Sequence, residues 1–231
     1  MTENGGITAV ITAAGASERF GSDKTEHLLC GHPCIVHTLR AFERSEQTVQ
    51  TVVVTRSEKM EYILDLKAMY GLEKLTAVVV GRRCRQASAA AGFTATDPSV
   101  GFIAVHDGAR PLITPEDIDR VALEAYRYGA AIAVRPSTDT IKYVTGDGFI
   151  KTTLDRKTIY GAATPQIFSR EIYQDMVDRF SDRFADFTDD SSMAEALGIK
   201  VKTVVCSASN IKITTPEDIV SAEAFLNAGK R

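Results

Sequence analysis

Short apolar runs alternate with amphipathic stretches along most of this chain, and this alternation limits the fold more than any other feature of the sequence. The apolar runs are rich in β-branched residues, which favour strands, and the stretches between them repeat apolar residues at helical spacing. Strands that are apolar throughout predict an α/β fold with a mostly parallel sheet, because helices then cover both of its faces. The expected strands are 6–14, 51–55, 76–81, 101–111 (strand and turn) and 130–136, and the expected helices are 33–45, 57–71, 114–129 and one from residue 85.

The composition is that of an ordinary globular protein, with 44% hydrophobic and 25% charged residues. A chain of 231 residues without a repeat, low-complexity tract or linker predicts one domain, 1–231. The net charge of -3 argues against nucleic acid and an anionic membrane as partners. We expect a cytoplasmic protein, because no apolar run approaches the roughly 20 residues of a membrane span, no secretory signal opens the chain and free thiols suit a reducing compartment.

The alternation breaks between about residues 136 and 165. Two extended runs flank Gly146, Asp147 and Gly148, which is a strong hairpin signal. A hairpin inserted into an α/β domain is either a flap over an active site or an arm that grips a second subunit. The apolar residues of these runs would otherwise stay exposed, so we favour a β-arm over 137–160 that joins a homodimer. Beyond it we expect helices over 169–184, from 189 and from 216, and a strand over 200–206.

Three segments should meet at one rim of the sheet, because ligands of open α/β sheets bind beyond the carboxyl ends of the strands. They are AAGAS (13–17), GRRCRQAS (81–88) and HDGARP (106–111). AAGAS fits neither the dinucleotide fingerprint nor the Walker pattern, so a phosphate loop and a plain tight turn both stay open. Asp107 follows an apolar strand and is placed to bind Mg²⁺ on nucleotide phosphates; the alternative is an aspartate that caps a turn. Arg110 could pair with Asp107 or stabilise that turn.

Two cations in the last third of the chain suggest a second anion site near the first. Arg156 follows the hairpin, and Lys212 lies at the end of a strand before a capped helix. A guanidinium can bind a phosphomonoester with two parallel hydrogen bonds. Taken singly, each of these cations is more typical of a solvated surface charge.

Several segments resemble the 2-C-methyl-D-erythritol 4-phosphate cytidylyltransferases of the non-mevalonate isoprenoid pathway in their order and spacing. They are HDGARP, DTIK, LDR, TPQIF, TDDSS and NIKITTPEDI, and the resemblance covers nearly the whole chain. HDGARP and NIKITTPEDI are quite specific, whereas the opening loop is less so. Ribitol-5-phosphate cytidylyltransferases share much of the pattern and are the close relatives from which this chain has to be distinguished.

The resemblance implies a Rossmann-like nucleotidyltransferase fold, a homodimer joined by the hairpin arm, and Mg²⁺-dependent transfer of CMP from CTP to a polyol phosphate with release of pyrophosphate. Catalysis is then mostly positioning and electrostatics without a general base, because the acceptor is already an ionised phosphate. The residues implied are Ala13, Ala14, Gly15 and Arg19 for the nucleotide and triphosphate, Gly81 and Ser88 for cytosine and ribose, Asp107 for Mg²⁺, and Thr140, Arg156, Thr188 and Lys212 for the acceptor phosphate or the α-phosphate. Some acceptor contacts would come from the arm of the partner.

The chain departs from the family pattern at two places. The family loop carries a second glycine, and a lysine eleven residues after the first glycine; here Ser17 and Glu26 stand there, with Lys24 two residues before Glu26. Two unit charges 4 Å apart interact by about 4 kcal/mol at an effective dielectric near 20, so an unscreened glutamate would repel a triphosphate. In GRRCRQAS, Arg82 and Arg83 stand where the family has a glycine and often an acidic residue, and Arg82 could crowd the base if its backbone needs the freedom of glycine.

Three readings of these departures stay open. Lys24 moves in through a shifted loop and serves as a catalytic cation beside Arg19 and Lys212, or Arg82 or Arg83 replaces the lysine, or CTP is bound weakly and turned over slowly. Another sugar-phosphate nucleotidyltransferase and a nucleotide-binding homodimer without catalysis are the alternative functions.

We expect Asp107→Ala to abolish Mg²⁺-dependent turnover with the thermal midpoint nearly unchanged. Glu26→Lys should raise kcat if the loop follows the family geometry, whereas no change or a loss would point to Lys24 or an arginine.

Overall fold

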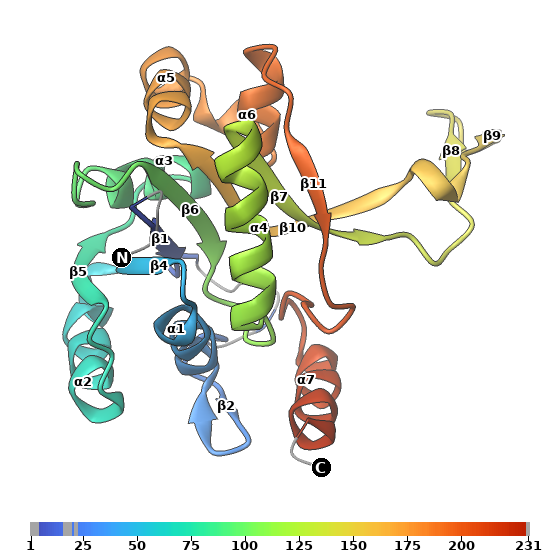
Figure 1. Cartoon of the computed structure of the whole chain (residues 1–231). Coiled ribbons are helices and arrows are strands. Elements are labelled where there is room, and N and C mark those ends of the chain that lie inside the picture. Colours follow the sequence, from blue (N-terminus) through green and yellow to red (C-terminus); the bar gives the residue numbers. More distant parts are fainter. Residues whose placement is uncertain (1–4, 16–19, 21–22, 230–231) are drawn as a thin grey trace.

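A seven-stranded sheet runs through the computed structural model, which describes residues 5–15, 20 and 23–229. The strand order is β11-β7-β10-β6-β1-β4-β5, and Figure 1 shows the sheet flanked by helices. The strands of this sheet are β1 (Ile7–Thr12), β4 (Thr48–Thr55), β5 (Leu75–Val80), β6 (Phe102–Asp107), β7 (Ala130–Pro136), β10 (Tyr160–Ser169) and β11 (Lys202–Val205). Every pairing is parallel except those of β10 with β6 and β7. The predicted α/β fold with a mostly parallel sheet is confirmed.

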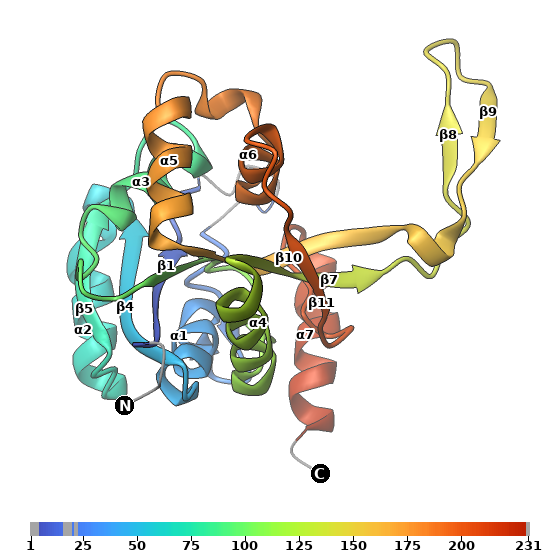
Figure 2. The same ribbon diagram turned by 45° about the horizontal axis from the view of Figure 1, so that its top comes forward.

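Helices cover both faces of the sheet, as the apolar strands require. One face carries α1 (Cys34–Arg44), α2 (Met60–Tyr70) and α4 (Pro115–Tyr128), and the other carries α3 (Arg85–Phe93), α5 (Arg170–Phe180) and α6 (Asp190–Ala196) (Figure 2). Strand β1 sends Ile7, Ala9 and Ile11 to the first face and Val10 to the second, because successive side chains of a strand alternate. The last helix, α7 (Pro216–Ala228), lies beside these layers over a smaller apolar cluster that includes Leu29.

Strand β10 is a central strand that the sequence did not indicate. It lies between β6 and β7 and is antiparallel to both. Proline is normally excluded from central strands because it cannot donate to the ladder. Here Pro165 lies in the register shift between Ala162 and Gln166, and pairing with β6 begins only at Gln166. Pro165 interrupts the strand pattern in the sequence, which is why the sequence does not indicate β10. In the structure, the register shift allows this proline to lie inside the sheet.

The predicted hairpin is present as β8 (Lys142–Val144) and β9 (Ile150–Thr153), between β7 and β10. Figures 1 and 2 both show it projecting away from the body of the molecule. Its apolar side chains are exposed, among them Tyr143, Phe149 and Ile150. A short ribbon, β2 (Leu28–Leu29) with β3 (His32–Pro33), precedes α1. Within the described residues, none of the helices has the length and apolarity needed to cross a membrane.

Candidate active site

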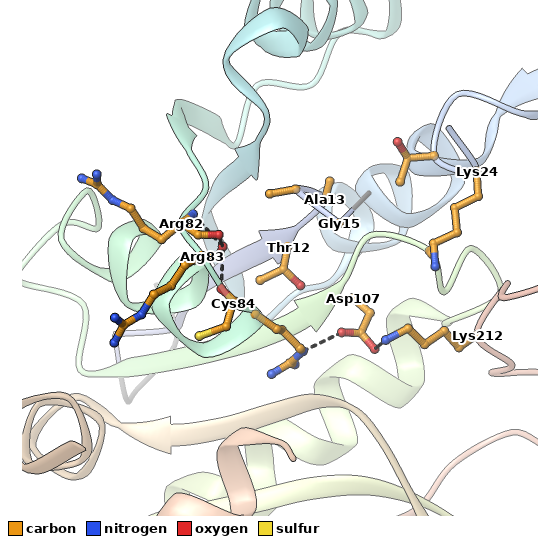
Figure 3. A pocket seen from close by; sticks show the side chains of 14 residues that line it. Thr12, Ala13, Gly15, Lys24, Arg82, Arg83, Cys84, Asp107 and Lys212 are labelled. Atoms are coloured by element: carbon orange, nitrogen blue, oxygen red, sulfur yellow. Dashed lines mark hydrogen bonds and ion pairs between the residues drawn. The ribbon is translucent and has the colours of Figure 1, made fainter. Parts of the chain in front are cut away.

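A cavity of about 360 Å³ opens beyond the carboxyl ends of β1 and β6. Its wall comes from the three segments that the sequence places at one rim: the loop after β1, the start of α3 and the end of β6 (Figure 3). Of the residues expected to act on the nucleotide or on the reacting phosphates, those that line this cavity are Ala13, Ala14, Gly15, Lys24, Ser88, Asp107 and Lys212. We call it the nucleotide cavity.

The carboxylate of Asp107 is the electrostatic centre of the site. Arg85 Nε donates to its Oδ1 at 2.9 Å, while Lys212 Nζ and Arg110 Nε lie 3.0 and 3.3 Å from its Oδ2. Burial raises the pKa of Asp107, but the charges of Arg85, Lys212 and Arg110 outweigh burial and hold the pKa well below its usual value. Asp107 is thus ionised. Arg110 pairs with Asp107, which was one of the two readings of the sequence, and its Nη1 also donates to the carbonyl of Asn210 in the loop between β11 and α7.

Arg85 links Asp107 to a second buried carboxylate. Its Nη1 lies 2.5 Å from Oδ2 of Asp190, the first residue of α6, whose side chain has no exposed surface. Burial lowers the pKa of Arg85, but Asp190 and Asp107 raise it above its usual value, so the guanidinium stays charged. The sequence analysis assigned Arg85 no role. The signal was its place in GRRCRQAS, where it opens the helix after a predicted strand.

A second cavity of about 260 Å³ adjoins the first and shares Arg85, Asp107 and Lys212 with it. Its remaining wall comes from β10 and from the segment before α6, which places Thr188 in it. That segment is fixed by Gln166, whose Nε2 donates to Asp189 Oδ2 at 2.7 Å and whose Oε1 accepts from the backbone N–H of Ser191. Two cavities that meet at one carboxylate and two cations can hold two anions side by side.

Gly81 supports the nucleotide cavity from beneath rather than lining it. A Cβ atom at Gly81 would come within 2.3 Å of the Ala14 Cβ atom, so only glycine lets the loop after β1 pack this closely against the end of β5. Ser88 is buried in the wall and accepts a hydrogen bond from the backbone N–H of Arg82 at 2.9 Å. Both residues shape the cavity where the sequence expected cytosine and ribose.

Two expected site residues of the arm lie outside both cavities. Thr140 and Arg156 are exposed residues of the arm, and they line neither cavity of their own chain. In a single chain they do not join the site. Arg19 lies outside the residues that the structure describes, so its expected contact with the triphosphate stays a prediction.

Comparison with known proteins decides the family. The family model described as IspD: 2-C-methyl-D-erythritol 4-phosphate cytidylyltransferase matches residues 7–228. The 2-C-methyl-D-erythritol 4-phosphate cytidylyltransferase of Syntrophus aciditrophicus (strain SB) is 39% identical over 223 residues, covering 95% of each chain. The chain belongs to this family. The enzyme of the same name from Dehalococcoides mccartyi (strain CBDB1) is 37% identical over 231 residues, covering 100% of each chain.

Solved structures of family members share the fold. The 4-diphosphocytidyl-2C-methyl-D-erythritol synthase of Anaerococcus prevotii DSM 20548 superposes with a TM-score of 0.86 at 31% identity, covering 96% of each chain. The 2-C-methyl-D-erythritol 4-phosphate cytidylyltransferase of Thermus thermophilus gives a TM-score of 0.78 at 27% identity, over 96% of this chain and 99% of that one. The predicted family resemblance is confirmed by sequence and by structure.

Two departures from the family pattern have a structural explanation. Glu26, at the position of the family lysine, does not line the nucleotide cavity; its carboxylate pairs with Lys59. Lys24 lines the cavity instead, and Figure 3 shows its side chain turned into it. The sequence suggested that an unscreened Glu26 would repel the triphosphate. In the structure, Lys59 balances the charge of Glu26, and the Glu26 side chain does not line the cavity.

The arginines of GRRCRQAS are the second departure. Within the described part of the chain, Cys30 is the only residue other than glycine with a positive φ, so Arg82 does not need the conformational freedom of the family glycine. Arg82 and Arg83 also line the cavity, and Figure 3 shows them on the side opposite Lys24. Arg83 Nη2 lies 3.4 Å from the carbonyl oxygen of Asp182. Lys24 is thus the cation that the opening loop itself brings to the cavity, while Arg82 and Arg83 add positive charge on the other side.

Proposed function

We propose that this chain transfers CMP from CTP to 2-C-methyl-D-erythritol 4-phosphate and releases pyrophosphate, as a step of non-mevalonate isoprenoid biosynthesis. The observation that carries the proposal is the meeting of two cavities at Arg85, Asp107 and Lys212. The nucleotide cavity takes the cytidine and triphosphate, and the second cavity takes the polyol phosphate. Membership of the family supports the choice of both substrates.

The reaction brings two anions together. An oxygen of the acceptor phosphate attacks the α-phosphorus of CTP, a new P–O bond forms, and the bond between the α-phosphorus and the bridging oxygen breaks as pyrophosphate leaves. Because the attacking oxygen is already ionised, the protein has to position the groups and stabilise negative charge rather than remove a proton.

Lys212 is the cation best placed to act at the junction. Its Nζ contacts Asp107 Oδ2 at 3.0 Å, and its side chain is 37% exposed, so it can turn from the carboxylate to a phosphate oxygen of either substrate. Lys24 supplies a second cation from the segment between β1 and β2. Asp107 keeps Arg85 and Lys212 in place until the phosphates arrive.

The site fits Mg²⁺ that arrives with the phosphates of CTP. Among the described residues, no three His, Cys, Asp or Glu side chains gather into a metal cluster. One carboxylate together with phosphate oxygens is a common way to hold Mg²⁺, and Asp107 Oδ1, which accepts from Arg85 Nε, retains a lone pair. Bound there, the ion would neutralise charge on the triphosphate and on the departing pyrophosphate.

The arm is proposed to complete the acceptor site across a homodimer. Thr140 and Arg156 lie on it, exposed and away from both cavities of their own chain. A partner that receives the arm would cover its apolar side chains and gain a guanidinium suited to a phosphomonoester. On this proposal each active site contains residues of both subunits.

Pyrophosphate release tests the proposed function directly. CTP, Mg²⁺ and 2-C-methyl-D-erythritol 4-phosphate are expected to give turnover, while ribitol 5-phosphate in parallel gives little. Turnover that prefers ribitol 5-phosphate, or another nucleotide, would move the assignment to a different sugar-phosphate nucleotidyltransferase. Binding of CTP with no turnover on either acceptor would favour a non-catalytic nucleotide-binding protein.

A further inference from the structure

The segment Asp23–Glu26 carries three charged residues along the rim of the nucleotide cavity, and only the cation faces inward. Lys24 and Thr25 line the cavity, whereas Asp23 and Glu26 do not. Both carboxylates pair with cations of one short turn, Arg56–Lys59, which joins β4 to α2 and contains a 3-10 turn over Ser57–Lys59.

Asp23 makes the more extensive of the two attachments. Its Oδ2 lies 2.5 Å from Arg56 Nη2, and its Oδ1 accepts from the backbone N–H of Thr25 at 3.0 Å and from the Thr25 hydroxyl at 2.6 Å. The Asp23 side chain is largely buried, so this carboxylate depends on its partners for compensation. Asp23 therefore fixes both the path of the loop and its distance from the end of β4.

Glu26 attaches the other end of the segment to the same turn. Its carboxylate pairs with Lys59 Nζ, and its backbone N–H donates to the carbonyl of Asp23 at 3.1 Å, which closes the loop on itself. The backbone N–H of Lys59 donates to the carbonyl of Arg56 at 3.0 Å, so the two cations are held in one rigid turn. The charges alternate, and pairing both acids on one side leaves the intervening lysine on the other.

We propose that the Arg56–Lys59 turn is a positioning device for Lys24: by pairing with Asp23 and Glu26 it directs both acids away from the triphosphate and presents the lysine to it. The proposal rests on the proposed function, because it assumes that the cavity binds CTP. Without Arg56 and Lys59, the two carboxylates would lie unpaired beside Lys24, where they would attract its ammonium group away from the phosphates. Arg56 and Lys59 touch no substrate and act through Lys24.

A double-mutant cycle on the dissociation constant of CTP, measured by calorimetry without acceptor, tests this role. Lys24→Gln is expected to raise Kd about tenfold, as for the loss of one charge-assisted contact. Arg56→Gln and Lys59→Gln should each raise Kd roughly threefold in the natural background, and by less than about 1.5-fold when Lys24 is already Gln. A merely structural role predicts instead that the losses add, and full additivity, or no change in Kd in the Arg56 and Lys59 variants, overturns the proposal.

Reversing one ion pair provides a second test that keeps the fold. Glu26→Lys alone should weaken CTP binding, because the new lysine repels Lys59, and Glu26→Lys with Lys59→Glu should restore it. Tighter binding by the single Glu26→Lys variant would mean that this residue faces the triphosphate, which overturns the proposal. Arg179→Gln is the matched control, since it breaks an exposed ion pair with Asp175 on α5 and should leave Kd unchanged. All of these measurements need CTP alone, so an inactive enzyme would count against the proposed function and not against the positioning role.

Discussion

Arg85 Nε lies 2.9 Å from Oδ1 of Asp107, and the other face of the same guanidinium is bound to Asp190. One side chain therefore joins the end of β6, the start of α3 and the start of α6, which together form the wall between the two cavities. Burying three charges is favourable only while each keeps its partners, because an unpaired buried charge is strongly destabilising. Arg85 and its two carboxylate partners therefore hold these elements together and also set the charge where the two cavities meet.

Arg85→Met is expected to lower the free energy of unfolding by roughly 3–5 kcal/mol, because it leaves the buried Asp190 without its counter-charge. Turnover should fall as well, since Asp107 loses a partner that orients it. Urea unfolding and pyrophosphate release measure the two effects. Arg127→Met, which breaks an exposed pair with Glu124, is the control and should change stability by less than about 1 kcal/mol. Equal stability of the two variants would contradict this view of Arg85.

Asp107→Ala should abolish turnover and also lower the thermal midpoint by several degrees. The sequence alone suggested that the midpoint would stay nearly unchanged, because it placed Asp107 as an open metal ligand. The structure shows three cations around a buried carboxylate, so its removal leaves Arg85, Arg110 and Lys212 repelling one another. Scanning calorimetry separates the two expectations, with Asp175→Ala on the exposed surface of α5 as control. A thermal midpoint equal to that of the control would favour the expectation from the sequence, in which Asp107 is an open metal ligand.

The pattern of strands and helices, and with it the rim of the sheet, could be predicted from local sequence. β-Branched runs and helical spacing depend on neighbouring residues, and the carboxyl-end rule then brings Ala13, Ser88 and Asp107 together from segments far apart in the chain. Strand β10 could not be predicted in this way. It contains a proline and pairs in an irregular register, so its strand conformation is decided by β6 and β7 on either side.

The contacts within the site also could not be predicted from local sequence patterns. Nothing near Glu26 in the sequence shows that it pairs with Lys59, and nothing near Arg85 shows that it bonds Asp190 across 105 positions. Such pairs form because the sheet order places the ends of distant segments side by side. A charge pattern can suggest that an anion binds, but the direction in which each charge points depends on tertiary structure.

Gly81→Ala should weaken CTP binding with little loss of acceptor affinity. The added methyl group would lie within 2.3 Å of the Ala14 Cβ atom, which forces the loop after β1 to move away from the end of β5. Steady-state kinetics should show a KM for CTP raised by about tenfold or more, because small displacements of a binding loop lose well-aligned contacts. Gly101→Ala is the matched control, since a Cβ atom there meets nothing within 4 Å. A KM for CTP no higher than that of the control would show that the loop adapts freely.

His106 makes the fold sensitive to acid. Its ring is fully buried, and burial lowers its pKa to about 3, although the charge of Asp107 acts in the opposite direction. The Thr164 hydroxyl accepts from the backbone N–H of Asp107 and lies 3.0 Å from Nδ1 of His106. Between pH 6.5 and about 3, the unfolded chain binds a proton at this histidine that the folded chain does not.

The free energy of unfolding should therefore fall as the pH drops through this window, by about 1.4 kcal/mol per pH unit for this one group. His106→Gln removes the titrating ring and should give a shallower dependence between about pH 6 and pH 4, where Asp107, with a depressed pKa, remains ionised in the folded protein. Urea unfolding at intervals of pH measures both slopes. The variant should be less stable than the natural protein at neutral pH and lose less on acidification. Identical slopes would mean that His106 is charged in the folded state.

Phe149→Asp should convert the proposed homodimer to monomers and reduce turnover. Phe149 is 72% exposed at the end of the projecting hairpin, and a carboxylate there would have to be desolvated if a second subunit covers it. Sedimentation velocity should show a dimer for the natural chain and a monomer for the variant. Activity should fall by about tenfold or more at low acceptor concentration, because Arg156 would no longer reach the acceptor phosphate of the other subunit.

Met69→Asp is the matched control for the arm, since Met69 is 73% exposed on α2, away from the hairpin. It should change neither the sedimentation coefficient nor the KM for the acceptor. If Phe149→Asp left a dimer with full activity, another surface would join the subunits, and Thr140 and Arg156 would have no route to an active site. If the variant were monomeric but fully active, the acceptor would be bound by one chain alone, and Thr188, Lys212 and Arg110 would account for its phosphate. Only loss of both the dimer and the acceptor affinity supports a site shared between subunits.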